Sequence, residues 1–197
     1  MSPLAKPNLQ PALNTIKTFA IHVRTLVVWL ALVLVLTAAE VRLPLQQEAV
    51  RTPAPDFALL DAKGKSVVLS SFRGKPVLLD VWATQCGGCV KEIPYFIDMH
   101  HEYARKGLAV VGVSMDILYE DLRGATEAWS LVNPFVADHH VNYTILMGDN
   151  GFTKSYSVTA LPVTYLIDKR GRIAATYIGL VDRDNIEGNI KALLAER

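Results

Sequence analysis

The chain has 197 residues, with 20 lysines and arginines against 19 aspartates and glutamates and a formal net charge of +1. Hydrophobic residues make up 51% of it, which excludes the composition of a disordered chain and is enough for a packed core. No basic patch or stripe is visible in the sequence, so the electrostatic footprint of a nucleic-acid-binding protein is absent.

The first 53 residues divide into three segments. Residues 1–18 are polar with scattered prolines, and we predict a tail on the cytoplasmic side. Residues 19–39 are apolar apart from His22 and Arg24 near their start, and they reach the length of about 20 residues that a membrane-spanning helix needs. Residues 40–53 are expected to be a linker, followed by one domain over residues 54–197.

The basic residues before the apolar run predict how the chain is oriented in the membrane. They place the N-terminus in the cytoplasm and the domain in the periplasm or outside the cell, which describes a single-pass protein of the inner membrane. A signal sequence that is removed is the alternative, because Thr37, Ala38 and Ala39 offer small residues at a suitable cleavage position. The domain would then be secreted. The long tail before the apolar run favours a retained anchor.

The rest of the chain alternates between strand and helix patterns. The predicted strands are a hairpin with arms at 57–60 and 66–69, parallel strands at 77–82 and 108–114, a less regular segment at 141–146, and a second hairpin at 163–168 and 173–178. The predicted helices cover residues 90–105, 118–131, 152–156 and 185–195. This order predicts an α/β fold with a central mixed sheet flanked by helices.

Both cysteines lie in the run Trp82-Ala83-Thr84-Gln85-Cys86-Gly87-Gly88-Cys89, where a strand pattern gives way to a helix pattern. Backbone N–H groups at a helix start have no internal partners, and the helix dipole places partial positive charge there. A thiolate at Cys86 is therefore favoured over a thiol. We predict a redox-active pair in which Cys86 is the nucleophile and Cys89 resolves the mixed disulfide.

Other uses of this cysteine pair fit the sequence less well. A zinc site needs four ligands, and the histidines of the predicted domain occur as the adjacent pairs His100-His101 and His139-His140, whose members point in different directions. A purely structural disulfide closing so small a loop removes little entropy from the unfolded chain. Peroxidase chemistry of the peroxiredoxin type calls for Thr and Pro where this chain has Ala83 and Leu79.

Asp80 interrupts the otherwise apolar strand at 77–82. Desolvation of a carboxyl in a strand buried on both faces raises its pKa. Asp80 is therefore a candidate general base that deprotonates Cys89. A hydrogen-bonded or hydrated carboxyl at the strand end is the alternative.

Three motifs in order resemble the TlpA/ResA-type, membrane-anchored members of the thioredoxin-like redoxin family. The first is Ala54-Pro55-Asp56-Phe57 with Leu69-Ser70-Ser71-Phe72-Arg73-Gly74-Lys75, the second is Asp80-Val81-Trp82-Ala83 with the two cysteines and Pro94, and the third is Tyr156 to Asp168 followed by Gly171. The resemblance covers roughly residues 52–197. It implies a thioredoxin-like fold with an extra N-terminal β-hairpin, and thiol-disulfide oxidoreductase activity that needs no metal or organic cofactor.

The sequence departs from the usual pattern of that family beside the cysteines. Gln85 and Gly88 stand where the family usually has Trp and Pro, and Asp80 follows thioredoxin where many TlpA-type proteins have Asn. The loss of Pro frees a backbone torsion and adds an N–H group near the thiolate. The direction of electron flow is therefore left open.

The resemblance also implies the substrate-binding residues. Pro162 corresponds to a cis proline that lies beside the cysteine pair, and Leu161 before it offers backbone groups to an extended substrate. Trp82 and Gln85 are assigned to the same substrate site. Three further residues are candidates for tuning the thiols: Glu92, Gly87 and Gly88. A solvated position on the helix surface is the favoured interpretation for Glu92.

The implied substrate is a disulfide in an exported protein, and the implied electron donor is a transmembrane thiol carrier. Relatives of this type often act in cytochrome or oxidase assembly, which is an analogy here. Two alternatives remain, namely a periplasmic dithiol oxidase and a non-catalytic assembly chaperone that uses the fold as a docking surface.

Overall fold

The computed structural model describes residues 44–196. The predicted tail, the predicted membrane span and the first residues of the predicted linker lie outside this range. Among the residues that are described, no helix combines the length and the apolar character that crossing a membrane requires.

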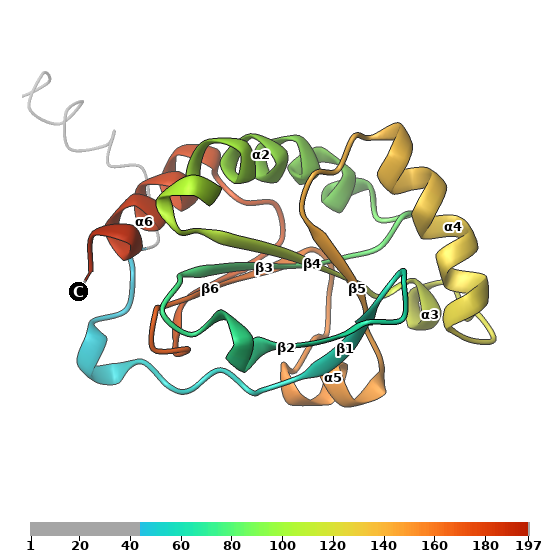
Figure 1. Cartoon of the computed structure of the whole chain (residues 1–197), viewed down its shortest axis with the longest axis horizontal. Coiled ribbons are helices and arrows are strands. Elements are labelled where there is room, and N and C mark those ends of the chain that lie inside the picture. Colours follow the sequence, from blue (N-terminus) through green and yellow to red (C-terminus); the bar gives the residue numbers. More distant parts are fainter. Residues whose placement is uncertain (1–43, 197) are drawn as a thin grey trace, which may run out of the picture. The chain divides into compact units, whose positions relative to one another are not determined.

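Seven strands form one mixed sheet (Figure 1). They are β1 (Ala58–Asp61), β2 (Ser66–Val68), β3 (Val77–Trp82), β4 (Ala109–Ser114), β5 (Thr144–Met147), β6 (Val163–Ile167) and β7 (Ile173–Ile178). Their order in the sheet is β2-β1-β5-β4-β3-β6-β7. Strand β3 pairs in parallel with β4 and antiparallel with β6. All six of its residues are buried, as expected for an apolar strand covered on both faces.

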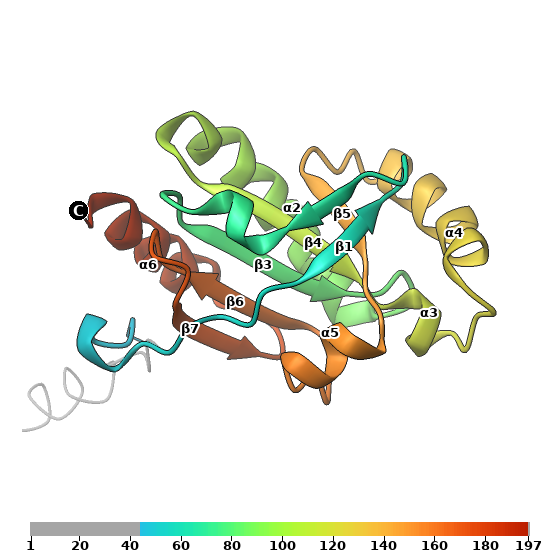
Figure 2. The same cartoon turned by 60° about the horizontal axis from the view of Figure 1, so that its bottom comes forward.

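Helices cover both faces of the sheet. The α-helices are α2 (Gly87–Tyr103), α3 (Asp116–Tyr119), α4 (Ala125–Asp138), α5 (Asn150–Ser155) and α6 (Arg183–Ala195), and short 3₁₀ turns lie at η1 (Glu48–Val50), η2 (Leu69–Phe72) and η3 (Ala104–Lys106). Helices α2 and α6 lie together on one face, and α5 lies on the other (Figures 1 and 2). The fold is the thioredoxin-like order that the resemblance implied, with the extra hairpin β1–β2.

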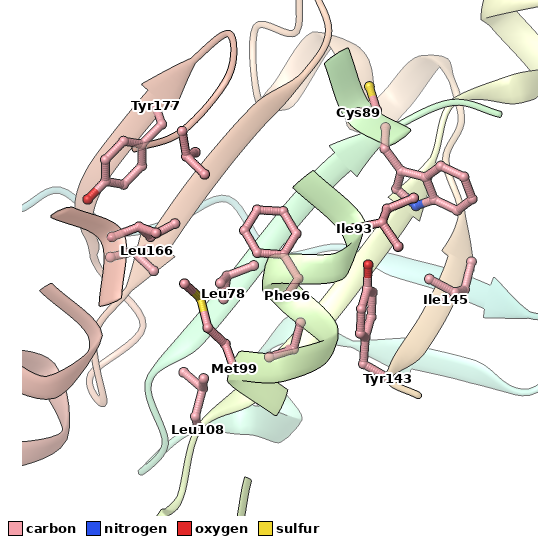
Figure 3. Close-up of a cluster of buried hydrophobic side chains, with 14 of the residues drawn as sticks. Leu78, Cys89, Ile93, Phe96, Met99, Leu108, Tyr143, Ile145, Leu166 and Tyr177 are labelled. Carbon is pink, nitrogen blue, oxygen red and sulfur yellow. The ribbon is translucent and has the colours of Figure 1, made fainter. Parts of the chain in front are cut away.

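The sheet separates two hydrophobic cores. On one face, Phe96 and Met99 of α2 pack with Leu78 of β3 and Leu166 of β6 (Figure 3). On the other face, a second cluster joins the hairpin β1–β2 and α5 to the alternate residues of the same strands. Because successive strand residues point to opposite faces, β3 contributes to both cores.

The predicted helix over 118–131 is wrong in its extent. The structure has two helices there, α3 and α4, separated by residues 120–124. Asp121 adopts a φ of 50°, in the left-handed region, which cannot continue a right-handed helix. The spacing of the apolar residues predicted a single helix, because this spacing does not reveal that one residue between them adopts a left-handed conformation.

Residues 44–53 differ from the linker that the sequence predicted, because they are part of the folded domain. The N–H of Gln46 bonds to the carbonyl of Ala174 at 2.8 Å, and the N–H of Ile173 bonds to the carbonyl of Thr52 at 2.8 Å. The side chain of Arg51 is almost fully buried.

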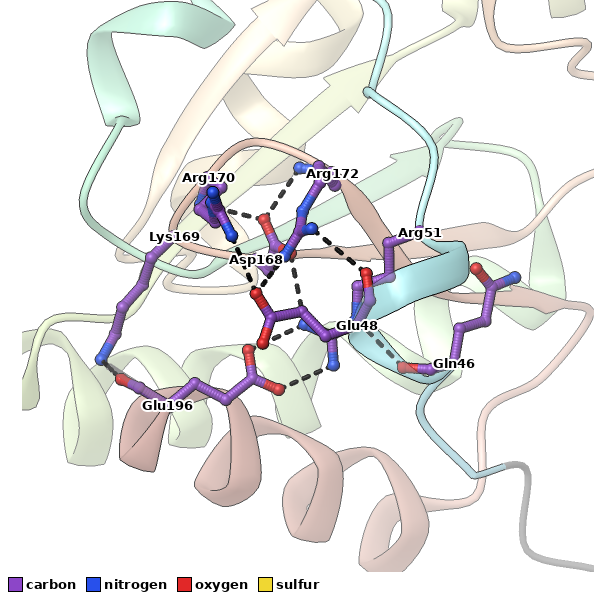
Figure 4. A network of polar contacts seen from close by, with 8 residues as sticks. All are labelled: Gln46, Glu48, Arg51, Asp168, Lys169, Arg170, Arg172 and Glu196. Atoms are coloured by element: carbon purple, nitrogen blue, oxygen red, sulfur yellow. Dashed lines mark hydrogen bonds and ion pairs between the residues drawn. The ribbon is translucent and has the colours of Figure 1, made fainter.

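Arg51 belongs to a network of ion pairs beside the β6–β7 turn (Figure 4). Its guanidinium lies 3.2 Å from Asp168 and 2.7 Å from Glu196 at the end of α6. Asp168 also pairs with Arg172 at 2.8 Å, and Arg172 reaches Glu48 at 2.9 Å. The network therefore ties residues 44–53 to a hairpin turn and to the end of the last helix.

We predict that Asp168→Ala destabilises the domain by about 3–5 kcal/mol, because it leaves the buried Arg51 without its nearest buried countercharge. Equilibrium denaturation at pH 7 measures this loss. The matched control is Glu102→Ala, which breaks the exposed pair with Lys106 at 3.3 Å and is expected to cost at most about 1 kcal/mol. Equal losses in the two variants would contradict the prediction.

Candidate active site

The cysteine pair lies where β3 passes into α2, as the sequence predicted. Cys86 and Cys89 are joined by a disulfide, with their Cα atoms 5.2 Å apart. Cys86 is the N-cap residue of α2, and its Sγ accepts the backbone N–H of Cys89 at 3.3 Å. Cys86 remains 5% exposed and Cys89 only 1%. The sulfur of Cys86 therefore lies at the positive end of the helix and is the more accessible of the two.

Pro162 lies against the first turn of α2. The Leu161–Pro162 peptide bond is cis, as the resemblance implied. A Cβ atom added at Gly88 would lie 3.1 Å from Cδ of Pro162, which is closer than most side chains tolerate. Gly88 therefore allows the helix that carries the cysteines to approach the start of β6 closely, whereas Gly87 faces open space.

Leu161 offers an unpaired stretch of backbone beside the cysteines. Within residues 44–196, none of the hydrogen bonds uses its N–H or its carbonyl. A cavity of about 190 Å³ adjoins it, lined by Met115, Leu118, Tyr119, Thr153, Val158, Thr159, Ala160 and Leu161. No charged side chain lines this cavity. Tyr119 is 52% exposed, so an apolar surface is accessible next to the open backbone.

Asp80 is buried behind the cysteine pair, as predicted. It is 1% exposed and sits in β3 between Gly112 of β4 and Thr164 of β6. Neither carboxyl oxygen has a hydrogen-bond partner among the described residues. Burial raises the pKa of Asp80 well above its usual value, and the nearby charge of Glu92 raises it further. A hydrogen-bonded carboxyl, the alternative considered from the sequence, is not observed.

Glu92 is not solvated, which corrects the interpretation favoured from the sequence. Its side chain is fully buried, and Oε1 accepts the backbone N–H of Val181 in the loop before α6. Its second oxygen has no partner in the described part of the chain. Burial raises the pKa of Glu92 to about 7, although the bond from Val181 opposes this. Glu92 follows Cys89 by three residues and so lies on the same, inward face of α2.

Trp82 was assigned to the substrate site, but the structure leaves none of its side chain exposed. It is fully buried, and its ring packs 5.1 Å from that of Phe135 in α4. Trp82 and Tyr143 both approach Gly112 of β4. Tyr143 is also buried (Figure 3), and its hydroxyl has no partner among the described residues. Gln85, by contrast, is exposed at the turn before Cys86.

The sequence interpretation missed Asp116, a fully buried carboxylate at the start of α3. It accepts the N–H and the hydroxyl of Thr84, two residues before Cys86, and the hydroxyl of Ser114 at 2.7 Å. A signal for it exists in the sequence. Asp116 lies two residues after the end of the second parallel strand. The carboxyl ends of adjacent parallel strands meet at one edge of the sheet, where binding sites often form.

The histidine pairs, unlike the buried cysteines, lie mostly at the surface. His101, His139 and His140 are exposed, and His100 is half-buried. Within residues 44–196, no group of three or more His, Cys, Asp or Glu side chains is arranged to hold a metal ion.

Comparison with known proteins identifies the family. Residues 50–176 match the AhpC/TSA family. A thiol-disulfide oxidoreductase ResA from Geobacillus kaustophilus is 31% identical over 145 residues, which is 74% of this chain and 78% of that protein. A ResA from Oceanobacillus iheyensis is 32% identical over 149 residues, covering 73% and 72% of the two chains.

Solved structures agree with these sequence relatives. A structure described as a thiol:disulfide interchange protein DsbE from Chlorobium tepidum superposes with a TM-score of 0.63 at 31% identity, covering 74% of this chain and 97% of that one. The family match spans more than half of the chain and includes the cysteine pair, the buried Asp80 and Pro162. The chain therefore belongs to the AhpC/TSA family, and within that family it is a thiol-disulfide oxidoreductase of the ResA-like type.

Proposed function

We propose that this oxidoreductase reduces disulfides in exported proteins. The observation that carries the proposal is the position of Cys86, which caps a helix directly beside the unpaired backbone of Leu161. The helix start favours a thiolate, and the open backbone is suited to hold an extended protein segment. The reactive sulfur of Cys86 and the backbone proposed to bind the substrate peptide, that of Leu161, thus lie close together.

The reaction proceeds in two exchanges. In the reduced enzyme, the Cys86 thiolate attacks one sulfur of the substrate disulfide, and the other substrate sulfur leaves as a thiolate that takes a proton from water. Cys89 then gives its proton to the Asp80 carboxylate and attacks Sγ of Cys86, which releases the second substrate thiolate. The substrate gains two electrons, and the enzyme is left with the Cys86–Cys89 disulfide seen in the structure.

Asp80 is suited to the second exchange because its pKa is raised. An ordinary carboxylate is a weak base toward a thiol, whereas one raised by burial and by the charge of Glu92 is closer to the thiol in proton affinity. The burial of both carboxyls supports this assignment.

The substrate segment adds as a strand at Leu161. In this arrangement, an apolar side chain near the substrate cysteine enters the cavity next to Tyr119. A cavity of about 150 Å³ holds a benzene molecule, so the 190 Å³ found here accommodates an aliphatic or aromatic side chain. A charged side chain would lose its hydration there without finding a partner.

The proposed cellular setting rests on the sequence. Residues 19–39 anchor the domain to the inner membrane, or are removed as a signal, and the domain works in the periplasm or outside the cell. An oxidising compartment leaves the pair oxidised unless electrons are supplied, so a transmembrane thiol carrier is the proposed donor. Exported cytochrome or oxidase-assembly thiols are the proposed substrates.

Trapping tests this function directly. In Cys89→Ala, the reaction stops at the mixed disulfide. We therefore expect covalent adducts with exported proteins, and dithiothreitol should cleave them. Non-reducing electrophoresis and mass spectrometry of the full-length protein from membranes measure them. The control Cys86→Ala leaves the resolving sulfur alone and is expected to trap nothing. Equal trapping by both variants, or none by Cys89→Ala, would contradict the proposal.

We predict that Asp80→Asn slows resolution of the mixed disulfide by about 100-fold or more, because Asn accepts no proton from Cys89. The first exchange is expected to keep its rate, so the mixed disulfide accumulates in rapid-quench experiments. In the unmodified protein, resolution accelerates with rising pH as Asp80 ionises, and this dependence disappears in Asp80→Asn. Asp98→Asn, on the exposed face of α2, is the control. Unchanged resolution kinetics would rule Asp80 out as the base.

We predict that Glu92→Gln removes a pH-dependent loss of stability. The unfolded chain releases the Glu92 proton near pH 4.5, whereas the folded domain holds it to about pH 7. Between these values the folded state binds more protons, so its stability falls as pH rises, by an amount on the order of 3 kcal/mol, and levels off above pH 7. Gln still accepts the N–H of Val181.

Urea denaturation at pH 4.5, 6 and 8 measures this difference. Glu102→Gln, an exposed residue of the same helix, is the control and should follow the unmodified protein. Glu92→Gln should also move the pH dependence of resolution to lower pH, since it removes a charge that raises the pKa of Asp80. Stability curves of Glu92→Gln that run parallel to those of the unmodified protein would refute the prediction.

A further inference from the structure

Asp116 is a buried acidic side chain that the two exchanges do not use. It is fully buried, and none of the ion pairs within residues 44–196 includes it. Its carboxylate is instead stabilised by donors. The N–H of Thr84 lies 3.0 Å from Oδ1, the hydroxyl of Thr84 bonds to the same oxygen, and the hydroxyl of Ser114 lies 2.7 Å from Oδ2. Two of these three donors belong to one residue, Thr84.

Thr84 lies in the short turn between β3 and α2. That turn is closed by a bond from the N–H of Cys86 to the carbonyl of Ala83 at 3.1 Å. In the described part of the chain, Thr84 makes no hydrogen bond other than those to Asp116, and Gln85 makes none. Asp116 is therefore the tertiary hydrogen-bond partner that fixes the residues leading to the nucleophile.

The short helix that begins at Asp116 forms part of the wall of the cavity next to Leu161. Asp116 is the first residue of α3, and the same short helix carries Leu118 and Tyr119, which line the cavity together with Leu161. The N–H of Met115 bonds to the carbonyl of Trp82 at 2.8 Å and holds this helix start against the end of β3. One carboxylate thus links the turn before Cys86 to the surface proposed to hold the substrate.

We infer that Asp116 is a positioning residue that aligns Cys86 with a protein disulfide held at Leu161, acting through Thr84. The inference rests on the proposed function, because alignment matters only for a substrate whose own position is fixed. A protein segment bound at Leu161 presents its sulfur from one direction, and small displacements of the nucleophile then slow the reaction strongly. A small free disulfide rotates to meet Cys86 wherever it lies.

This difference between substrates defines the test. Thr84→Val keeps the shape of the side chain and removes the hydroxyl that bonds to the carboxylate, whereas Thr84→Ser keeps that hydroxyl. Hydrogen bonds to charged groups are strong enough that their loss changes rates by about 10- to 100-fold. We expect Thr84→Val to lower the rate with a disulfide-bonded protein such as insulin by about that factor. The rate with 5,5′-dithiobis(2-nitrobenzoic acid) should change by less than about threefold. Thr84→Ser should keep both rates close to those of the unmodified protein.

Asp116→Asn provides a second variant, since its amide group replaces one acceptor oxygen by a donor, and the same selective loss is expected. The matched control is Asp56→Asn, which alters a carboxylate that bonds the N–H groups of Phe57 and Ser70 in the N-terminal hairpin region and should spare both rates. Circular dichroism and thermal unfolding of each full-length variant show whether the fold is kept.

Each outcome has a distinct meaning. A selective loss with insulin that Thr84→Ser rescues supports the positioning role. Equal slowing with both disulfides would overturn it, since the bond would then govern the reactivity of Cys86 itself, and no slowing with either would overturn it as well. Failure of the unmodified protein to reduce insulin would contradict the proposed function and this inference together, whereas an active unmodified protein with an unaffected Thr84→Val contradicts the inference alone.

Discussion

The start of helix α2 is the constraint on which the rest of the site depends. Cys86 occupies the N-cap position, so its sulfur takes the place of a capping oxygen and accepts the N–H of Cys89. This arrangement requires β3 to end at Trp82 and the chain to turn within a few residues. The apolar strand, the turn and the close approach of Gly88 to Pro162 together keep the sulfur at the helix end.

Two buried carboxyl groups, those of Asp80 and Glu92, support the proposed chemistry of the site. Asp80 enters from the central strand and Glu92 from the helix, so neither one depends on a flexible loop. Burial raises the pKa of Asp80, and the charge of the nearby Glu92 raises it further. A buried acid without a hydrogen-bond partner is costly to a fold, and such groups are typical of functional sites.

Local pattern explains which parts of the site were predictable. The cysteine pair and the buried Asp80 are each readable from a short stretch of chain, because a strand or helix period indicates what is buried within it. The role of Pro162 was implied only by the resemblance to a known family. The solvent exposure of Glu92 was misjudged, because the burial of a side chain depends on what packs against it. The loop at Val181 covers Glu92, and Phe135 of α4 covers Trp82. Both partners are distant in sequence.

The sequence by itself determined the redox pair, its place between a strand and a helix, the succession of strands and helices along most of the chain and the apolar run over residues 19–39. These follow from composition and from spacing along the chain, which local physics governs. Only the tertiary structure decided that Glu92 is buried, that residues 44–53 join the domain through Arg51, and that Asp116 holds the turn before Cys86. Each of these depends on a contact between segments far apart in the chain, and such a contact leaves no periodic trace in the sequence.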